Sequence, residues 1–109
     1  MALQTLRFLL KPMGKYVSVP NEWSHTGVVG SGDMEVLMRH EKLDGAVSVT
    51  VRTPVRGFDE IWEKVLARFV KEQSLGDVSI EINDNNATPY IVSMRLKQAL
   101  SEAMEGSGL

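Results

Sequence analysis

The sequence predicts a single α+β domain, a two-layer sandwich in which about four mostly antiparallel strands form a sheet and two amphipathic helices cover one of its faces. Several short segments alternate apolar and polar residues, as half-buried strands do, and two longer segments repeat apolar residues every three or four positions. The 109 residues, 43% of them hydrophobic, suit one compact core. We therefore expect the order β-β-β-α-β-α within one domain spanning residues 1–109.

The chain opens with a predicted strand and a long connection. Apolar residues alternate over residues 6–10, and Lys11-Pro12 ends this strand. Residues 13–26 contain glycine, proline and isolated apolar residues without periodicity, which is typical of a surface connection. Tyr16 and Trp23 are expected to anchor this connection to the body of the domain.

Two further strands are predicted in succession. Residues 27–40 alternate from Met34 onward, and residues 47–52 contain the most regular alternation of valine with polar residues in the chain. Only a polar turn at residues 41–45 separates them. We expect the two strands to pair as a hairpin.

An amphipathic helix and a fourth strand follow. Asp59 is a plausible N-cap, and the apolar residues after it recur at helical spacing. They are Ile61, Trp62, Val65, Leu66, Phe69 and Val70. Gly76-Asp77 is expected to end the helix, and alternation over residues 78–83 predicts the next strand.

The last element is a second amphipathic helix. Thr88 is expected to cap it, with Pro89 in the first helical position, where the missing N–H costs nothing. Its apolar stripe consists of Val92, Leu96, Ala99, Leu100 and Ala103. Residues 105–109 are expected to form a flexible tail.

Composition excludes several classes of function. Twelve basic and fourteen acidic residues give a net charge of −2, without a basic block that could neutralise phosphates, so a nucleic-acid partner is not expected. No apolar run reaches the length of a secretory core or a membrane span, so we expect a cytoplasmic protein without a membrane partner. The absence of cysteine removes disulfides, zinc-thiolate sites and thiol catalysis, and fits a reducing compartment.

The most informative motif is Gly30-Ser31-Gly32-Asp33. Glycines on both sides leave the serine hydroxyl clear of neighbouring side chains and permit backbone angles that other residues avoid. The motif is not a dinucleotide fingerprint or a P-loop, because a third glycine and a Gly-Lys-Ser/Thr are missing and a strand follows where a helix should begin. Nothing adjacent would activate Ser31 as a nucleophile. The pattern favours a serine that receives a group, although a Gly-Ser-Gly alone is also an ordinary tight turn.

Other candidate sites have simpler interpretations. His25 and His40 lie in polar segments and are expected to be solvated surface residues, and with the scattered acids they show no metal-ligand spacing, so no metal site is predicted. Asp84 lies in a turn-forming cluster that an Asx hydrogen bond would explain. Ser74, in Gln-Ser-Leu, lacks the aspartate that precedes the pantetheine serine of helical acyl carrier proteins, and it lies at the end of a helix.

Several segments together resemble the acyl carrier (delta) subunit of malonate decarboxylase, in the same order over nearly the whole chain. They are Thr5-Leu6-Arg7-Phe8, residues 28–37 with the serine motif, Gly57-Phe58 with Trp62, residues 66–69, Glu81-Ile82-Asn83-Asp84 with Ala87-Thr88-Pro89, and residues 95–100. The Ser-Gly-Asp core is shared with the acyl carrier (gamma) subunit of citrate lyase. The remaining segments favour the malonate decarboxylase family.

The resemblance implies that Ser31 is a phosphorylated attachment point for 2'-(5''-phosphoribosyl)-3'-dephospho-CoA, whose thiol holds acetyl and malonyl thioesters while malonate is converted to acetate and CO2. It implies a carrier that is not itself catalytic. The implied partners are an acyl transferase (alpha-type) subunit, malonyl decarboxylase subunits, a holo-carrier synthase and a malonyl transacylase. Asp33 would orient the hydroxyl or engage the attaching enzyme and its metal, or else close the loop onto backbone donors.

Two alternatives remain at this point. The first is a citrate lyase carrier, with the same attachment chemistry and a different acyl cargo, and the second is a small regulatory or ligand-binding domain in which Ser31 is only a turn residue. The chain departs from the delta-subunit pattern in two places. Residues 11–26 do not align, and Asn85-Asn86 stands where a less polar pair is expected.

Overall fold

The computed structural model describes residues 3–11, 14–20 and 22–106, and within them it confirms the α+β class. The elements are β1 (Gln4–Leu10), β2 (Ser24–Gly27), β3 (Asp33–His40), β4 (Val47–Thr53), α1 (Asp59–Gln73), β5 (Val78–Asn85) and α2 (Pro89–Gly106). The sheet therefore has five strands where about four were expected, because β2 was not predicted.

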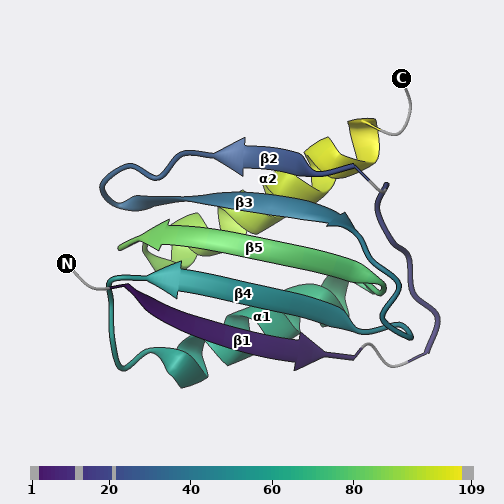
Figure 1. The fold of residues 1–109 in the computed structure, drawn as a ribbon, viewed down its shortest axis with the longest axis horizontal. Helices are drawn as coiled ribbons and strands as arrows, with labels where there is room; N and C mark the ends of the chain where they lie inside the picture. The colour runs from purple at the N-terminus through teal and green to yellow at the C-terminus, as the bar shows by residue number, and fades with distance from the viewer. Residues whose placement is uncertain (1–2, 12–13, 21, 107–109) are drawn as a thin grey trace.

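One mixed sheet forms the front layer and both helices lie behind it, so one face of the sheet is left uncovered (Figure 1). The strand order is β1-β4-β5-β3-β2, and all neighbours are antiparallel except the parallel pair β4 and β5. Alternate residues of the central strands are buried, as their sequence pattern predicts. The connection between β2 and β3, which contains Ser31, lies at the left end of the sheet in Figure 1.

The expected hairpin between residues 27–40 and 47–52 is wrong. β3 and β4 are not neighbours, because β5 lies between them and pairs with both. The chain leaves β4, passes through α1 and returns as the parallel strand β5, and such a crossover needs a long connection that the helix supplies. β5 thereby takes the place that a local hairpin would have filled.

Asp77 holds the connection from β3 to β4 where it passes the start of β5. Its carboxylate Oδ1 accepts hydrogen bonds from the backbone N–H groups of Leu43 (3.0 Å) and Gly45 (2.7 Å). Its backbone carbonyl accepts from Glu41, and its N–H donates to Ala46. The hydrogen bonds that its carboxylate accepts from Leu43 and Gly45 lower the pKa of Asp77 below its usual range. Asp77 therefore supplies hydrogen-bond partners for the backbone of the connection from β3 to β4, which passes the start of the intervening strand β5.

Residues 14–20 are not merely a surface connection. Val17 forms a bridge with Leu75, and Val19 is buried in the core. The two predicted anchors do contact the body of the domain: the Tyr16 hydroxyl donates to Asp77 Oδ2 at 3.0 Å, and the guanidinium of Arg39 lies 5.0 Å from the centre of the Trp23 ring. Both aromatic side chains remain almost half exposed.

Both helices bury most of the expected apolar stripe, and the start of α1 differs from the prediction in two respects. Asp59 is the first residue of α1 and not its cap; Phe58 is the N-cap residue and makes no side-chain cap bond. Ile61 is 48% exposed, whereas Trp62, Leu66, Phe69 and Val70 are buried. The cap of α2 is as predicted, since Thr88 Oγ1 accepts from the N–H of Ile91 at 3.3 Å.

Methionines and aliphatic residues fill the space between the helices and the sheet. Met34 and Met38 are fully buried and pack with the valines and isoleucines of β4 and β5. α2 continues through Gly106, two residues into the predicted tail, and residues 107–109 lie outside the described residues.

Candidate functional site

The connection between β2 and β3, residues 28–32, is short and stands out from the end of the sheet (Figure 1). Val28 and Val29 are more than half exposed, and Ser31 is exposed at its tip. Exposed loops on a rigid scaffold are where proteins commonly place functional groups. Two bulky apolar side chains beside a hydroxyl offer another protein a surface to bind.

Ser31 occupies a tight turn closed by backbone hydrogen bonds. The N–H of Asp33 donates to the carbonyl of Gly30 at 3.0 Å, which places Ser31 and Gly32 at the two central positions. Gly32 has a φ of +74°, as the second central position of a type II turn requires, and a Cβ there would meet no atom within 4 Å. Gly30 does not adopt a positive φ. Only one of the two flanking glycines therefore uses backbone angles that favour glycine, and both leave space around the hydroxyl.

The turn is attached to β5, and the strand before it is attached to α2. The N–H of Gly32 donates to the carbonyl of Asn85 at the end of β5 at 2.8 Å, and Asp33 begins β3 opposite the same residue. Thr26, at the end of β2, is buried and donates to Glu102 of α2. The hydroxyl of Ser31 is thus exposed on a turn whose backbone is fixed.

Asp33 forms a bidentate ion pair with Arg95 of α2. Arg95 Nε lies 2.9 Å from Oδ1 and Arg95 Nη2 lies 2.6 Å from Oδ2, and Oδ1 also accepts from the N–H of Met34 at 2.7 Å. These contacts lower the pKa of Asp33 to about 2, with the Arg95 hydrogen bonds as the largest cause. Within the described residues, the carboxylate makes no hydrogen bond to Ser31. Asp33 connects the turn to the helix layer.

Gly27 provides the room for this ion pair. A Cβ at Gly27 would collide with the carbonyl oxygen of Met34 and would lie 3.2 Å from Arg95 Nε. Gly27 also has a φ of +85°. Because position 27 has no side chain, Arg95 can pass beside the backbone of β2 and reach Asp33.

The ion pair between Asp33 and Arg95 predicts a pH-dependent stability. A carboxyl whose pKa is lowered from 3.8 to about 2 on folding stabilises the folded state above pH 3.8, and this contribution disappears as the pH falls through 2. Asp33→Asn should unfold at a lower urea concentration than the unmodified chain at pH 7, and the difference should shrink between pH 5 and about 2. Urea titrations over this range measure it.

The matched control is Glu63→Gln, which removes an exposed carboxylate on α1 that makes no ion pair with the described residues. Its unfolding midpoint should follow that of the unmodified chain at every pH. If Asp33→Asn did the same, the ion pair would contribute nothing to stability.

The residues considered as alternative sites have structural partners. His25 is exposed, as expected, and its Nε2 lies 2.7 Å from Glu35 Oε2. His40 was also expected to be solvated but is half-buried, and its Nδ1 lies 2.8 Å from the hydroxyl of Ser18. Asp84 is buried in β5, where it accepts from Thr53 and from two backbone N–H groups that follow it. This agrees with the expected Asx-type bond.

Ser74 caps the end of α1. It adopts a left-handed backbone conformation with a φ of 50°, and its N–H donates to Lys71. Across the described parts of the chain, no three side chains of the metal-binding types lie close enough together to hold a metal ion. No helix among the described residues is both long and apolar enough to cross a membrane.

The sequence did not indicate Gly27 or Arg95 as parts of the site. Arg95 lies 62 positions after Asp33, and on α2 it stands one residue before the buried Leu96 of the apolar stripe. The one available signal was its place within the block 95–100 that resembles the delta subunit. A glycine three residues before the motif has no distinctive meaning in the sequence alone.

Comparison with known proteins shows which family the sequence matches. The family model described as malonate decarboxylase delta subunit (MdcD), an acyl carrier protein, matches residues 21–103. A malonate decarboxylase acyl carrier protein of Malonomonas rubra is 61% identical over 79 residues, which cover 72% of this chain and 70% of that protein. One from Xanthomonas campestris pv. campestris (strain B100) is 48% identical over 81 residues, covering 74% of this chain and 76% of the relative.

A solved structure shares the fold. It is a chain in the crystal structure of a Pseudomonas malonate decarboxylase hetero-tetramer in complex with malonate, with a TM-score of 0.74 and 30% sequence identity over 94% of this chain and 99% of that chain. The family model, the relatives and the solved structure all agree with the resemblance seen in the sequence. The chain belongs to the family of malonate decarboxylase acyl carrier proteins, the delta subunits.

Proposed function

We propose that this chain is the acyl carrier subunit of a malonate decarboxylase and that Ser31 carries 2'-(5''-phosphoribosyl)-3'-dephospho-CoA through a phosphodiester. The observation that carries the proposal is the position of Ser31, exposed at the tip of a type II turn that is fixed to β5 and α2. A protruding hydroxyl on a fixed turn can enter the active site of another enzyme.

The residues around Ser31 fit a large covalent group. A Cβ at Gly32 would meet nothing within 4 Å, and a Cβ at Gly30 would make only an ordinary contact with Val28 at 3.7 Å. Space therefore surrounds the hydroxyl on both sides. When bound, the group supplies the terminal thiol that this cysteine-free chain lacks, and the thiol holds acyl groups as thioesters.

Ser31 is an acceptor in this proposal and not a catalyst. Loading breaks the Oγ–H bond of Ser31 and forms an Oγ–P bond. The donor is an activated form of the prosthetic group that carries additional phosphates; its phosphoanhydride bond breaks and these phosphates leave. Among the described residues, no histidine or carboxylate hydrogen-bonds to Ser31, so the base that takes the proton belongs to the loading enzyme. The carrier contributes position, and Val28 and Val29 contribute an apolar surface beside the hydroxyl.

The proposed partners follow from this role. A carrier subunit presents its arm to the holo-carrier synthase, to an alpha-type acyl transferase, to a malonyl transacylase and to the decarboxylase subunits. The hetero-tetramer that contains the similar solved chain supports assembly with other malonate decarboxylase subunits. Cytoplasmic location remains our expectation. The family match supports malonate over citrate as the source of the acyl cargo.

The test is the intact mass of the chain after coexpression with a holo-carrier synthase. The mass should increase by one prosthetic group, and peptide mapping should locate the increase on the peptide that contains Ser31. An unchanged mass, under conditions that load the Malonomonas rubra carrier, would contradict the proposal.

A further inference from the structure

We propose that a hollow beside the Ser31 turn holds the sugar-phosphate end of the arm, with Arg52 as its anion contact. The inference rests on the proposed function, because it concerns the group attached to Ser31. The hollow, called here the Arg52 hollow, has a volume of about 330 Å³. Leu3, Val29 and Pro54 supply its apolar lining, and its polar groups come from Arg52, Asn83, Asp84 and Asn85.

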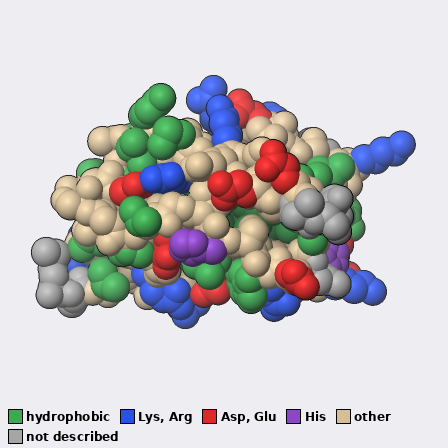
Figure 2. Space-filling model, turned by 90° about the horizontal axis from the view of Figure 1, so that it is seen from above, with side chains coloured by type: hydrophobic (Ala, Val, Ile, Leu, Met, Phe, Trp, Pro, Cys, Tyr) green, Lys and Arg blue, Asp and Glu red, His purple; other side chains and the backbone are tan. Residues whose placement is uncertain are grey.

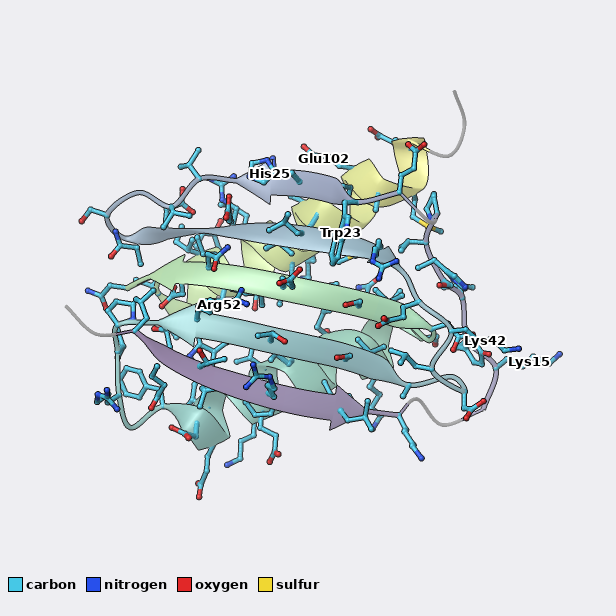
Figure 3. The ribbon with its side chains drawn as sticks, in the orientation of Figure 1. Lys15, Trp23, His25, Lys42, Arg52 and Glu102 are labelled. Atoms are coloured by element: carbon cyan, nitrogen blue, oxygen red, sulfur yellow. The ribbon has the colours of Figure 1, made fainter. Side chains whose placement is uncertain are left out.

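The hollow and the Ser31 turn adjoin one another. Val29 belongs to the same connection as Ser31, and Asn85 accepts the backbone hydrogen bond of Gly32 at 2.8 Å. Figure 3 shows Arg52 on the uncovered face of the sheet, toward the end at which this connection lies. The first atoms attached to Ser31 would therefore begin at the rim of the hollow.

The size of the hollow suits part of the arm. Its volume of about 330 Å³ falls at the lower end of the range of roughly 300–1,000 Å³ that ligand sites in proteins span. This is enough for a phosphate with its sugar and too small for the entire group. The proximal end is the part that the tether holds in place, and a tethered ligand has an effective concentration in the millimolar range, so weak contacts suffice to hold it.

Arg52 has most of its hydrogen-bonding capacity available. Its one ion pair, from Nη1 to Glu81 Oε1 at 3.4 Å, joins side chains that are 40% and 34% exposed. Exposed pairs of this kind contribute little to stability, so a phosphate can compete for the guanidinium. The planar guanidinium also offers paired N–H donors that match phosphate oxygens.

The asparagines supply the groups that a sugar requires. Asn83 donates through Nδ2 to Glu35 Oε1 at 2.7 Å, and its side-chain carbonyl oxygen accepts no hydrogen bond from the described residues. The Asn85 side chain makes no hydrogen bond to the described residues. Amides of this kind both donate to and accept from hydroxyls. Asp84 also lines the hollow, but both of its carboxylate oxygens already accept hydrogen bonds, from Thr53 and from two backbone N–H groups.

The test compares the unloaded and loaded chain by 1H–15N NMR. Loading the chain without substitutions should shift the NMR signals of the backbone and side-chain amides of Asn83 and Asn85 and of the Nε–H of Arg52. In Arg52→Gln these shifts should be lost although Ser31 is still loaded, and the 31P line of the phosphodiester should narrow because the phosphate moves more freely.

The matched control is Arg7→Gln, which removes the same charge from the same face of the sheet outside the hollow. Arg7 lies on the edge strand β1, opposite Thr50. Its loaded form should show the shifts of the unmodified chain. Asn85→Ala is a second variant, which should reduce the Arg52 shift without altering the surface charge.

The outcomes separate the two proposals. If the chain without substitutions gained no mass, both the attachment at Ser31 and the proposed role of the hollow would be overturned. Normal loading with shifts confined to residues 28–33 would overturn the hollow alone. Shifts at Asn83 and Asn85 that persist in Arg52→Gln would overturn the role of Arg52.

Discussion

Replacing Ser31 with alanine is expected to abolish covalent loading and reduce malonate-dependent release of CO2 to the level of an assay without the carrier. Ser31 is the exposed hydroxyl on the turn between β2 and β3, and without its oxygen no phosphodiester can form. The folded state should be unaffected, because substitutions of exposed side chains usually change the free energy of unfolding by less than about 0.5 kcal/mol. Intact mass, the assay of CO2 and a thermal melt measure the three quantities.

Ser74→Ala is the control for this result. Ser74 is also an exposed serine in a turn-like conformation, but it ends α1. This variant should load fully and support normal decarboxylation with the partner subunits. Loading of Ser31→Ala, or its loss in Ser74→Ala, would place the attachment elsewhere.

The face of the domain on the side of β2 is consistent with transient contacts to several partners. Figure 2 views the molecule from the side of β2 and shows acidic, basic and hydrophobic side chains intermixed, without a field of one sign. Such a surface gives no electrostatic reason to hold one partner permanently. A carrier that visits several active sites needs this property, because each complex must dissociate before the next one forms.

Local patterns predicted the elements better than their arrangement. Alternation located β1, β4 and β5 because each buries one set of alternate residues, and the apolar stripes located both helices. The pairing of β4 with β5 depends on a helix that separates them and on no local signal, so the shorter connection from β3 to β4 was mistaken for a hairpin.

The missed strand β2 shows a second limit. Its four residues, Ser24–Gly27, are polar or glycine, and it is an edge strand of which only Thr26 is buried. A strand this short cannot display an alternating pattern. Its position follows from tertiary contacts: pairing with β3 and the bond from Thr26 to Glu102 of α2.

In the candidate site, too, local features were predictable and tertiary contacts were not. The exposure of Ser31 follows from the residues beside it, so the motif indicated it. The partner of Asp33 could not be inferred, because Arg95 comes from a helix 62 positions later and reaches Asp33 only past a glycine of β2. The pairing depends on how the helix packs on the sheet.

The second large effect is expected from Gly27→Ala, which should unfold at a much lower urea concentration than the unmodified chain. The added methyl group would collide with the carbonyl oxygen of Met34 and crowd Arg95, and the φ of +85° is unfavourable for alanine. Backbone strain of this kind costs about 1–3 kcal/mol, and the collision adds to it. Because Arg95 must move, Asp33→Asn should have a smaller effect in the Gly27→Ala background than alone.

Two neighbouring glycines make this prediction specific. Gly32→Ala meets the same conformational penalty, with a φ of +74°, but no collision, so it should destabilise the fold by only about 1 kcal/mol. Gly30→Ala meets neither, and its midpoint should be close to that of the unmodified chain. The order of stability should therefore be Gly30→Ala, then Gly32→Ala, then Gly27→Ala. If Gly27→Ala were no less stable than Gly32→Ala, the close approach of Arg95 and β3 would not be what requires a glycine at position 27.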